Sequence, residues 1–158
     1  MPSQFTVNIE IDTAVPDFMN AEIPLGQIAE KVATEAKENI RRQQSPDGTP
    51  FTPLAKRTVQ KKGFSMALID KGIMFNAISV FHIAKNQFEV GVIPRGKPRR
   101  DLVALIHQEQ GVPSKKGRIV RPFLGMSSRL LKWANDRMER WMAEKAQKAA
   151  HKFINLKY

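Results

Sequence analysis

The chain has 158 residues, a formal net charge of +11 at neutral pH and no cysteine, which excludes a structural disulfide and a thiolate metal site. No stretch approaches the roughly 20 apolar residues of a membrane span, and the first residues lack the pattern of a secretory signal. With 42% hydrophobic residues, the sequence predicts one domain over residues 1–158 with a modest core, present in the cytoplasm and without a membrane partner.

Charge is unevenly distributed along the chain. Residues 1–30 hold five acidic residues and no lysine or arginine, whereas residues 95–121 hold eight basic residues. The isoelectric point near 10.2 indicates an acidic partner. That partner is DNA, an acidic face of another protein, or the acidic amino-terminal segment of a neighbouring subunit. The sequence leaves all three open.

Residues 1–24 are predicted to form a strand and a connection. Apolar and polar residues alternate from Phe5 to Ile11, which is the period of a strand with one buried face. From Leu25 the period becomes helical, and Pro24 suits the first turn of that helix. The predicted buried stripe of the helix consists of Leu25, Ile28, Ala29, Val32, Ala33, Ala36 and Ile40.

A turn, a short helix and a hairpin are predicted in the middle of the chain. Ser45 to Pro53 contains three prolines and a glycine, a composition typical of turns. Residues 54–64 are basic and are predicted to end in a loop. A helix is expected from Lys71 to Ser79 with Asp70 as its N-cap, and a hairpin is expected from Val80 to Ile93.

Residues 94–121 are predicted to form a basic arm. A short helix is expected within it from Asp101 to Gln108, and residues 112–121 are either a basic loop or a hairpin. From residue 126 to residue 158 the period is helical, with one of two adjacent serines as the N-cap. The apolar stripe of this last helix consists of Leu131, Ala134, Met138, Met142, Ala146, Ala149 and Phe153.

The last helix is longer than about 25 residues, so part of its face is expected to pack on another subunit. Trp133 and Trp141 flank its apolar stripe, either as core residues or, where exposed, as a partner site. Together these elements predict an α+β fold. A small, mainly antiparallel sheet packs on a central helix, followed by the basic arm and the long carboxy-terminal helix.

No set of residues in the sequence supports catalysis. His107 is the histidine in the most distinctive context, but no nucleophile or paired carboxylate accompanies it. We expect its ring to bond a backbone group and to hold the turn that ends at Gly111. The sequence shows neither a phosphate-binding glycine loop nor a metal-ligand pattern, so no catalytic residue, metal or cofactor is predicted and the protein is not expected to be an enzyme.

The basic run has two interpretations. Its cations suit a phosphate backbone, because such contacts require only positive charge. The run holds no aromatic residue before Phe123, so stacking on single strands is not expected, and a solvated or subunit-facing arm is the other interpretation. The candidates for a partner-facing or DNA-facing surface, including the two tryptophans, are Arg95, Lys97, Arg99, Arg100, Lys115, Lys116, Arg118, Trp133 and Trp141.

Three strings then stand out by their order and spacing: Ser45-Pro46-Asp47-Gly48-Thr49-Pro50-Phe51, Ile106-His107-Gln108-Glu109-Gln110-Gly111 and Arg121-Pro122-Phe123-Leu124-Gly125. Together with Leu68 to Met74 and a hairpin containing Val90-Gly91, they make the chain similar to the phage virion morphogenesis family from about Leu25 to about Trp141. This family comprises the Mu-type tail-completion proteins. Two departures are Lys71, where the family often has threonine, and Glu109-Gln110, which lengthens the step to Gly111. The motif residues expected to hold the scaffold are Pro46, Asp47, Gly48, Pro50, Phe51, His107, Gln108, Gly111, Arg121, Pro122, Phe123, Leu124 and Gly125.

The resemblance implies a structural protein of the virion neck or tail end, assembled in the host cytoplasm. Such a protein completes or caps the tail and helps join it to the head as part of a ring around the DNA channel, most simply a homohexamer. The implied partners are other copies of the chain, tail tube or tail terminator proteins and head connector proteins, with non-specific contact to channel DNA. The alternatives are a basic DNA-binding accessory protein and an assembly chaperone absent from the mature particle.

Overall fold

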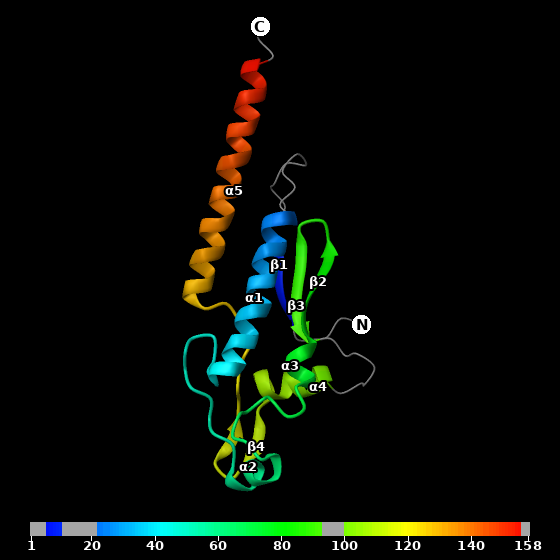
Figure 1. Ribbon diagram of the computed structural model, residues 1–158, viewed down its shortest axis with the longest axis vertical. Helices are drawn as coiled ribbons and strands as arrows, with labels where there is room; N and C mark the ends of the chain where they lie inside the picture. The colour runs from blue at the N-terminus through cyan, green and yellow to red at the C-terminus, as the bar shows by residue number, and fades with distance from the viewer. Residues whose placement is uncertain (1–5, 11–21, 93–99, 156–158) are drawn as a thin grey trace.

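The structure, a computed structural model, describes residues 6–10, 22–92 and 100–155, and it has the α+β fold expected from the sequence. Two small antiparallel sheets accompany the helices. Figure 1 shows helix α1 in the middle of an elongated molecule, with the larger sheet on one side of it and the long helix α5 on the other.

Helix α1 (Glu22–Arg42) is the centre of the core. All seven positions of its predicted stripe, from Leu25 to Ile40, are buried. The helix begins inside the segment predicted as a connection, because Pro24 lies in the first turn, where a missing N–H group costs no hydrogen bond. The prediction of a central helix with this buried face is confirmed.

The larger sheet has the strand order β1-β3-β2, and both pairings are antiparallel. Strand β1 (Thr6–Glu10) and strand β2 (Ile78–Ala84) flank β3 (Gln87–Val92), as Figure 1 shows. Val90 of β3 is fully buried and pairs with a valine on each side. The predicted hairpin is confirmed, and β2 begins two residues before the expected start at Val80.

The connection between α1 and the sheet holds two short helices. Helix α2 (Lys56–Lys62) was not predicted and contains no buried residue. Helix α3 (Ile73–Ala77) is shorter than predicted, and its N-cap is Gly72 with a φ of 70°, not Asp70. The predicted Asp70 cap is therefore wrong, because the chain enters this helix through a left-handed conformation that glycine adopts without a steric cost.

Beyond the sheet, the predicted arm contains a helical segment and a hairpin. Helix α4 (Arg100–Leu105) continues into the π-helical turn η1 (Ile106–Gln110). Strands β4 (Val112–Ser114) and β5 (Gly117–Ile119) then form a second antiparallel sheet. Of the two interpretations of residues 112–121, the hairpin is the one found.

Helix α5 (Ser128–Asn155) is the longest element of the chain. Ser127 is its N-cap, since its hydroxyl accepts the Leu130 N–H at 3.1 Å. Figure 1 shows that α5 leaves the side of α1 and extends past both α1 and the sheet. Within the described ranges, no helix combines the length and apolar character needed to cross a membrane.

Candidate functional site

The motifs singled out in the sequence meet at the carboxy-terminal end of α1. The side chain of Gln108 bonds the backbone of the closing motif: its Nε2 donates to Leu124 O at 2.8 Å, and its Oε1 accepts the N–H groups of Phe123 at 2.9 Å and Leu124 at 3.2 Å. Asn39 of α1 is buried and donates to Phe123 O at 3.1 Å. These bonds satisfy buried backbone groups that no strand partner reaches.

Arg121 connects the closing motif to the segment that follows the proline-rich turn. Its guanidinium is buried and donates to the carbonyl oxygens of Thr52 at 2.9 Å and Pro53 at 3.4 Å. Its own N–H donates to His107 O at 2.7 Å. Arg121 therefore links three segments that are distant in the sequence. We call the hydrogen-bonded group of Asn39, Gln108, Arg121 and their backbone partners the polar junction.

The proline-rich turn packs against the same junction. Asp47 accepts the Thr49 N–H at 3.0 Å, and this bond lowers the pKa of the Asp47 carboxyl. A Cβ atom added to Gly125 would lie 3.1 Å from the ring of Pro46, so a larger residue at position 125 would press on the turn. Phe51, which ends the turn, is buried in the core. The structure thus places Pro46, Gly125 and Phe51 together as packing residues.

His107 lies beside the junction in an electropositive environment. Burial is the first cause that lowers the pKa of its ring, and the charges of Arg121 and Lys62 lower it further. Its Nδ1 is buried and has no hydrogen-bond partner within the described part of the chain. This nitrogen therefore bonds no backbone group there, and the expected bond of the ring stays a prediction. Arg118 holds the turn at Gly111, since it donates to Gly111 O at 2.9 Å.

The turn that ends at Gly111 is wider than an α-helical turn. The Gly111 N–H donates to Ile106 O at 2.6 Å, five residues back, which closes a π-helical turn. The π-helical turn includes Glu109-Gln110, the two residues that lengthen the step in the sequence. Gly111 itself has a φ of 72° and a ψ of 151°, a conformation that residues with a side chain rarely adopt.

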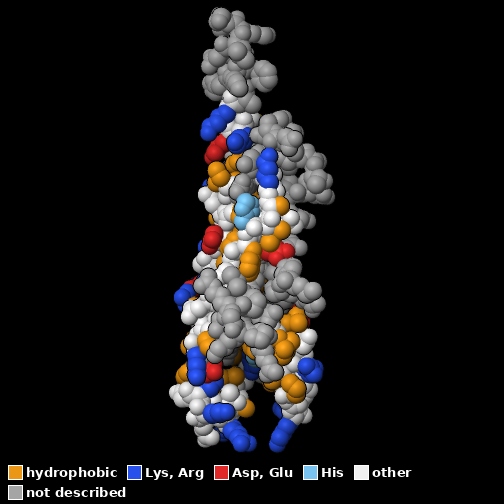
Figure 2. Space-filling model, turned by 90° about the vertical axis from the view of Figure 1, so that its right-hand side faces the viewer, with side chains coloured by type: hydrophobic (Ala, Val, Ile, Leu, Met, Phe, Trp, Pro, Cys, Tyr) orange, Lys and Arg blue, Asp and Glu red, His pale blue; other side chains and the backbone are white. Residues whose placement is uncertain are grey.

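The candidate basic residues are only partly brought together. Arg95, Lys97 and Arg99 lie outside the described residues, as does the side chain of Arg100. Lys115, Lys116 and Arg118 are exposed on the β4–β5 hairpin. Figure 2 shows Lys and Arg side chains at the two tips of the lower, forked end of the molecule. Figure 1 places α2 and the hairpin at that end.

Sequence reasoning missed the second half of this basic surface. Lys56, Arg57 and Lys61 are exposed on α2, at the same end of the molecule as the hairpin. The signal was present as a basic stretch, but it lacked the apolar periodicity by which a helix is normally recognised. We call the six exposed cations of the two elements the basic end: Lys56, Arg57, Lys61, Lys115, Lys116 and Arg118.

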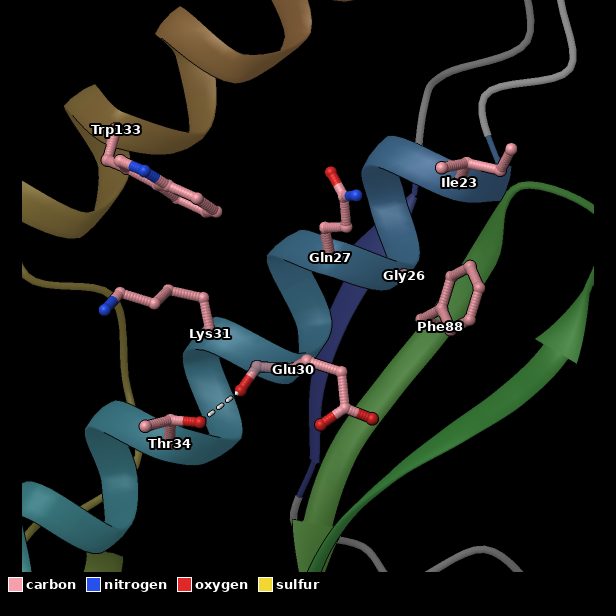
Figure 3. Close-up of a pocket in the computed structure, with 8 residues that line it drawn as sticks. All are labelled: Ile23, Gly26, Gln27, Glu30, Lys31, Thr34, Phe88 and Trp133. Atoms are coloured by element: carbon pink, nitrogen blue, oxygen red, sulfur yellow. Dashed lines mark hydrogen bonds between the residues drawn. The ribbon is translucent and has the colours of Figure 1, made fainter.

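The two tryptophans of α5 have different surroundings. Trp141 is 6% exposed and belongs to the core, so it does not form an exposed partner site in this chain. Trp133 lines an open groove of about 820 Å³ between α1 and α5 (Figure 3). Gly26 lies on the floor of this groove, and the absence of a side chain there lets the ring of Phe88 approach α1.

No cluster suited to metal binding is present in the described ranges, where no three His, Asp or Glu side chains come close enough to hold an ion. Lys62 and Arg121, the cations nearest to His107, bond backbone carbonyls: Lys62 Nζ donates to Met66 O at 2.8 Å and also to Ile69 O. The arrangement supports the backbone of three segments. It presents no nucleophile beside a base in the part of the chain that the structure describes.

The comparison with protein families matches the part of the chain that contains this scaffold. The model of the phage virion morphogenesis family matches residues 9–143, which includes the polar junction, the basic end and the first half of α5. The chain therefore belongs to the phage virion morphogenesis family and is a virion-associated morphogenesis protein. Neither the comparison with curated proteins nor the comparison with solved structures found a match.

Proposed function

We propose that this morphogenesis protein completes the end of the phage tail as one subunit of a homo-oligomeric ring, most simply a hexamer, and helps join the tail to the head. The observation that carries the proposal is the second half of α5, which extends past the rest of the chain (Figure 1). Residues 142–148 of this helix are all exposed. In this proposal a neighbouring subunit covers them.

The length of α5 supports this role. Its 28 residues span about 42 Å, against about 31 Å for the 21 residues of α1. A helical stretch of fewer than about 12–15 residues is marginal in water without packing. The protruding half therefore gains stability from a partner that the isolated chain lacks.

A second apolar face on α5 indicates where that partner packs. Leu130, Ala134 and Trp141 face the core and are buried. Leu131 and Met142 are 49% and 44% exposed, and their spacing of 11 residues, about three turns, places them on one face. Both belong to the stripe predicted from the sequence, whereas Ala134 of that stripe is buried and Met138 packs against the core, so the predicted stripe coincides only in part with the face that this chain buries.

A ring also needs two unlike surfaces, because each subunit presents a different patch to each neighbour. The apolar face of α5 that carries Leu131 and Met142 is one candidate for such a surface, and the groove lined by Trp133 is the other. These two patches support a heterologous contact between copies of the chain, with tail tube or terminator proteins and head connector proteins as the neighbours above and below.

The first test is the mass of the purified chain in solution, followed across protein concentration by light scattering. We expect ring-sized assemblies of the 17.9 kDa subunit, alone or on isolated tails. The double variant Leu131→Glu/Met142→Glu should remain monomeric and fail to sediment with tails. The matched control Lys132→Gln/Lys148→Gln lowers the net charge by the same two units at exposed positions of α5 and should assemble normally.

The second test measures head–tail joining. Tails made without the protein should fail to join filled heads, and adding the purified chain should restore infectious particles. The α5 double variant should not restore them, whereas the lysine control should. A chain that neither self-associates nor binds tails, or that is missing from finished particles, would contradict the proposal and favour the assembly-chaperone alternative.

A further inference from the structure

Helix α2 contributes nothing to the core, yet it holds cations in fixed positions. All of its residues, Lys56–Lys62, lie outside the buried set. Three of them, Lys56, Arg57 and Lys61, have exposed side chains. A seven-residue helix without packing is unstable by itself, so it is retained here by its attachments at either end.

The β4–β5 hairpin is built in the same way. Its turn residues Lys115 and Lys116 are exposed, and the strand residues on both sides are exposed or half-buried. Residues 112–120 include no acidic residue. Arg118 is anchored through the carbonyl oxygens of Gln110 and Gly111, and this bond fixes the base of the hairpin while the two lysines stay free of it.

The roots of the two elements are tied together. Arg121 follows β5 directly and donates to the carbonyl oxygens of Thr52 and Pro53, which precede α2. At the other end of α2, Lys62 lies close enough to Arg121 for their charges to interact. The basic end therefore consists of two elements, α2 and the β4–β5 hairpin, which are joined at their roots and fixed relative to each other.

Within the described part of the chain, no ion pair neutralises the charges of the basic end. Between described residues, the ion pairs join Lys31, Arg41, Arg42 and Arg129 to Glu35 or Glu38. These pairs involve α1 and α5 and none of the six cations. Like charges that form no ion pair repel one another and create a positive potential, which attracts an anionic partner.

We propose that the basic end binds the phosphate backbone of duplex DNA, with α2 as one contact and the β4–β5 hairpin as the other. Four of its six cations are lysines, a residue type depleted from protein–protein interfaces, and the exposed aromatic residues that mark such interfaces are scarce there. Phosphate contacts require only positive charge and carry no sequence specificity. This inference goes beyond the tail-completion role and is tested on the single chain, so its failure leaves that role standing.

The test is the binding of the full-length protein to a fluorescent 30-base-pair duplex, followed by anisotropy between 50 and 300 mM NaCl. Each phosphate contact contributes about 0.9 to the slope of log K against log salt. Lys56→Gln/Arg57→Gln/Lys61→Gln should lower the slope by roughly 2 to 3, and Lys115→Gln/Lys116→Gln should lower it by roughly 1 to 2. Lysine-to-arginine exchange at positions 56, 61, 115 and 116 should preserve binding.

A matched control distinguishes a site from net charge. Lys85→Gln/Lys132→Gln/Lys148→Gln removes three exposed cations away from the basic end and should leave the slope unchanged. An equal loss in this control would overturn the proposal. The proposal would also be overturned if poly-glutamate displaced the duplex at equal charge, because the partner would then be an acidic protein face. Circular dichroism of each variant verifies that the fold is intact.

Discussion

Gln108 and Leu124 pair as two residues of a sheet would: the Gln108 amide donates to Leu124 O at 2.8 Å and accepts the Leu124 N–H at 3.2 Å. A side chain thus takes the place of a backbone strand partner. The side-chain oxygen of Gln108, Oε1, also accepts the Phe123 N–H at 2.9 Å, so one side-chain amide bonds three backbone groups. This pairing holds the closing motif against the helical segment that ends at Gly111.

Gln108→Ala should therefore destabilise the protein more than a typical surface substitution. It removes three hydrogen bonds to backbone groups at a part-buried site, at a cost of about 1–3 kcal/mol. Denaturant unfolding measures the loss. The neighbouring exposed Glu109→Gln serves as the control and should change stability by less than about 0.5 kcal/mol. Equal effects would show that the amide bonds contribute nothing.

Gly111→Ala should be among the most destabilising glycine substitutions. An added Cβ would lie 2.9 Å from Arg118 Cβ and 3.2 Å from Val120, and the φ of 72° with ψ of 151° is strained for alanine. We expect a loss of about 3 kcal/mol or more from strain and overlap together. Gly48 also has a positive φ, but a Cβ atom added there would meet open space. Gly48→Ala therefore measures the cost of backbone strain alone, which should be about 1 kcal/mol.

Stability should fall on mild acidification because of His107. Burial, with Arg121 and Lys62, lowers the pKa of this ring in the folded protein. The unfolded chain, with a pKa of about 6.5, then binds more protons than the folded chain at weakly acidic pH. The stabilising contribution is complete above about pH 6.5 and is lost as pH falls through the folded-state pKa. His107→Gln should flatten the unfolding free energy between pH 7 and 5.

Arg121→Ala tests the link between the closing motif and α2. The buried guanidinium donates to two carbonyl oxygens, so its loss should cost about 2–3 kcal/mol. Hydrogen exchange should speed up over residues 52–62. Removing this charge should also raise the pKa of His107, which proton NMR of the imidazole can follow. Arg121→Lys should lie between wild type and alanine, because one ammonium cannot reproduce the planar fork. An unchanged His107 pKa would contradict the assigned arrangement.

The elements with strong apolar periodicity were predictable from the sequence. Local burial determines the apolar stripe of α1 from Leu25 to Ile40 and the alternation around Val90. Both are therefore visible as a period in the amino-acid sequence. Helix α2 was missed for the opposite reason, since none of its residues is buried and no apolar period marks it. The sequence predicts Asp70 as the N-cap of α3, whereas the structure has Gly72 there. A left-handed backbone conformation at a glycine gives no distinctive signal in a single sequence.

The polar junction could be predicted only as a set of scaffold residues. Nothing in the sequence says that Gln108 bonds Leu124 or that Arg121 reaches Thr52, 69 residues away. Such bonds depend on tertiary approach, which periodicity does not encode. For the same reason the sequence does not show which groups surround the His107 ring, whose Nδ1 has no partner within the described ranges.

The junction has a consequence for how this chain can diverge. The side chains of Asn39, Gln108 and Arg121 form hydrogen bonds to main-chain atoms. Every residue type offers the same main-chain groups, except that proline lacks the N–H. The side chain at the exposed position 52 can therefore vary while three polar residues preserve the shape. A lineage built this way loses recognisable sequence faster than it loses its architecture.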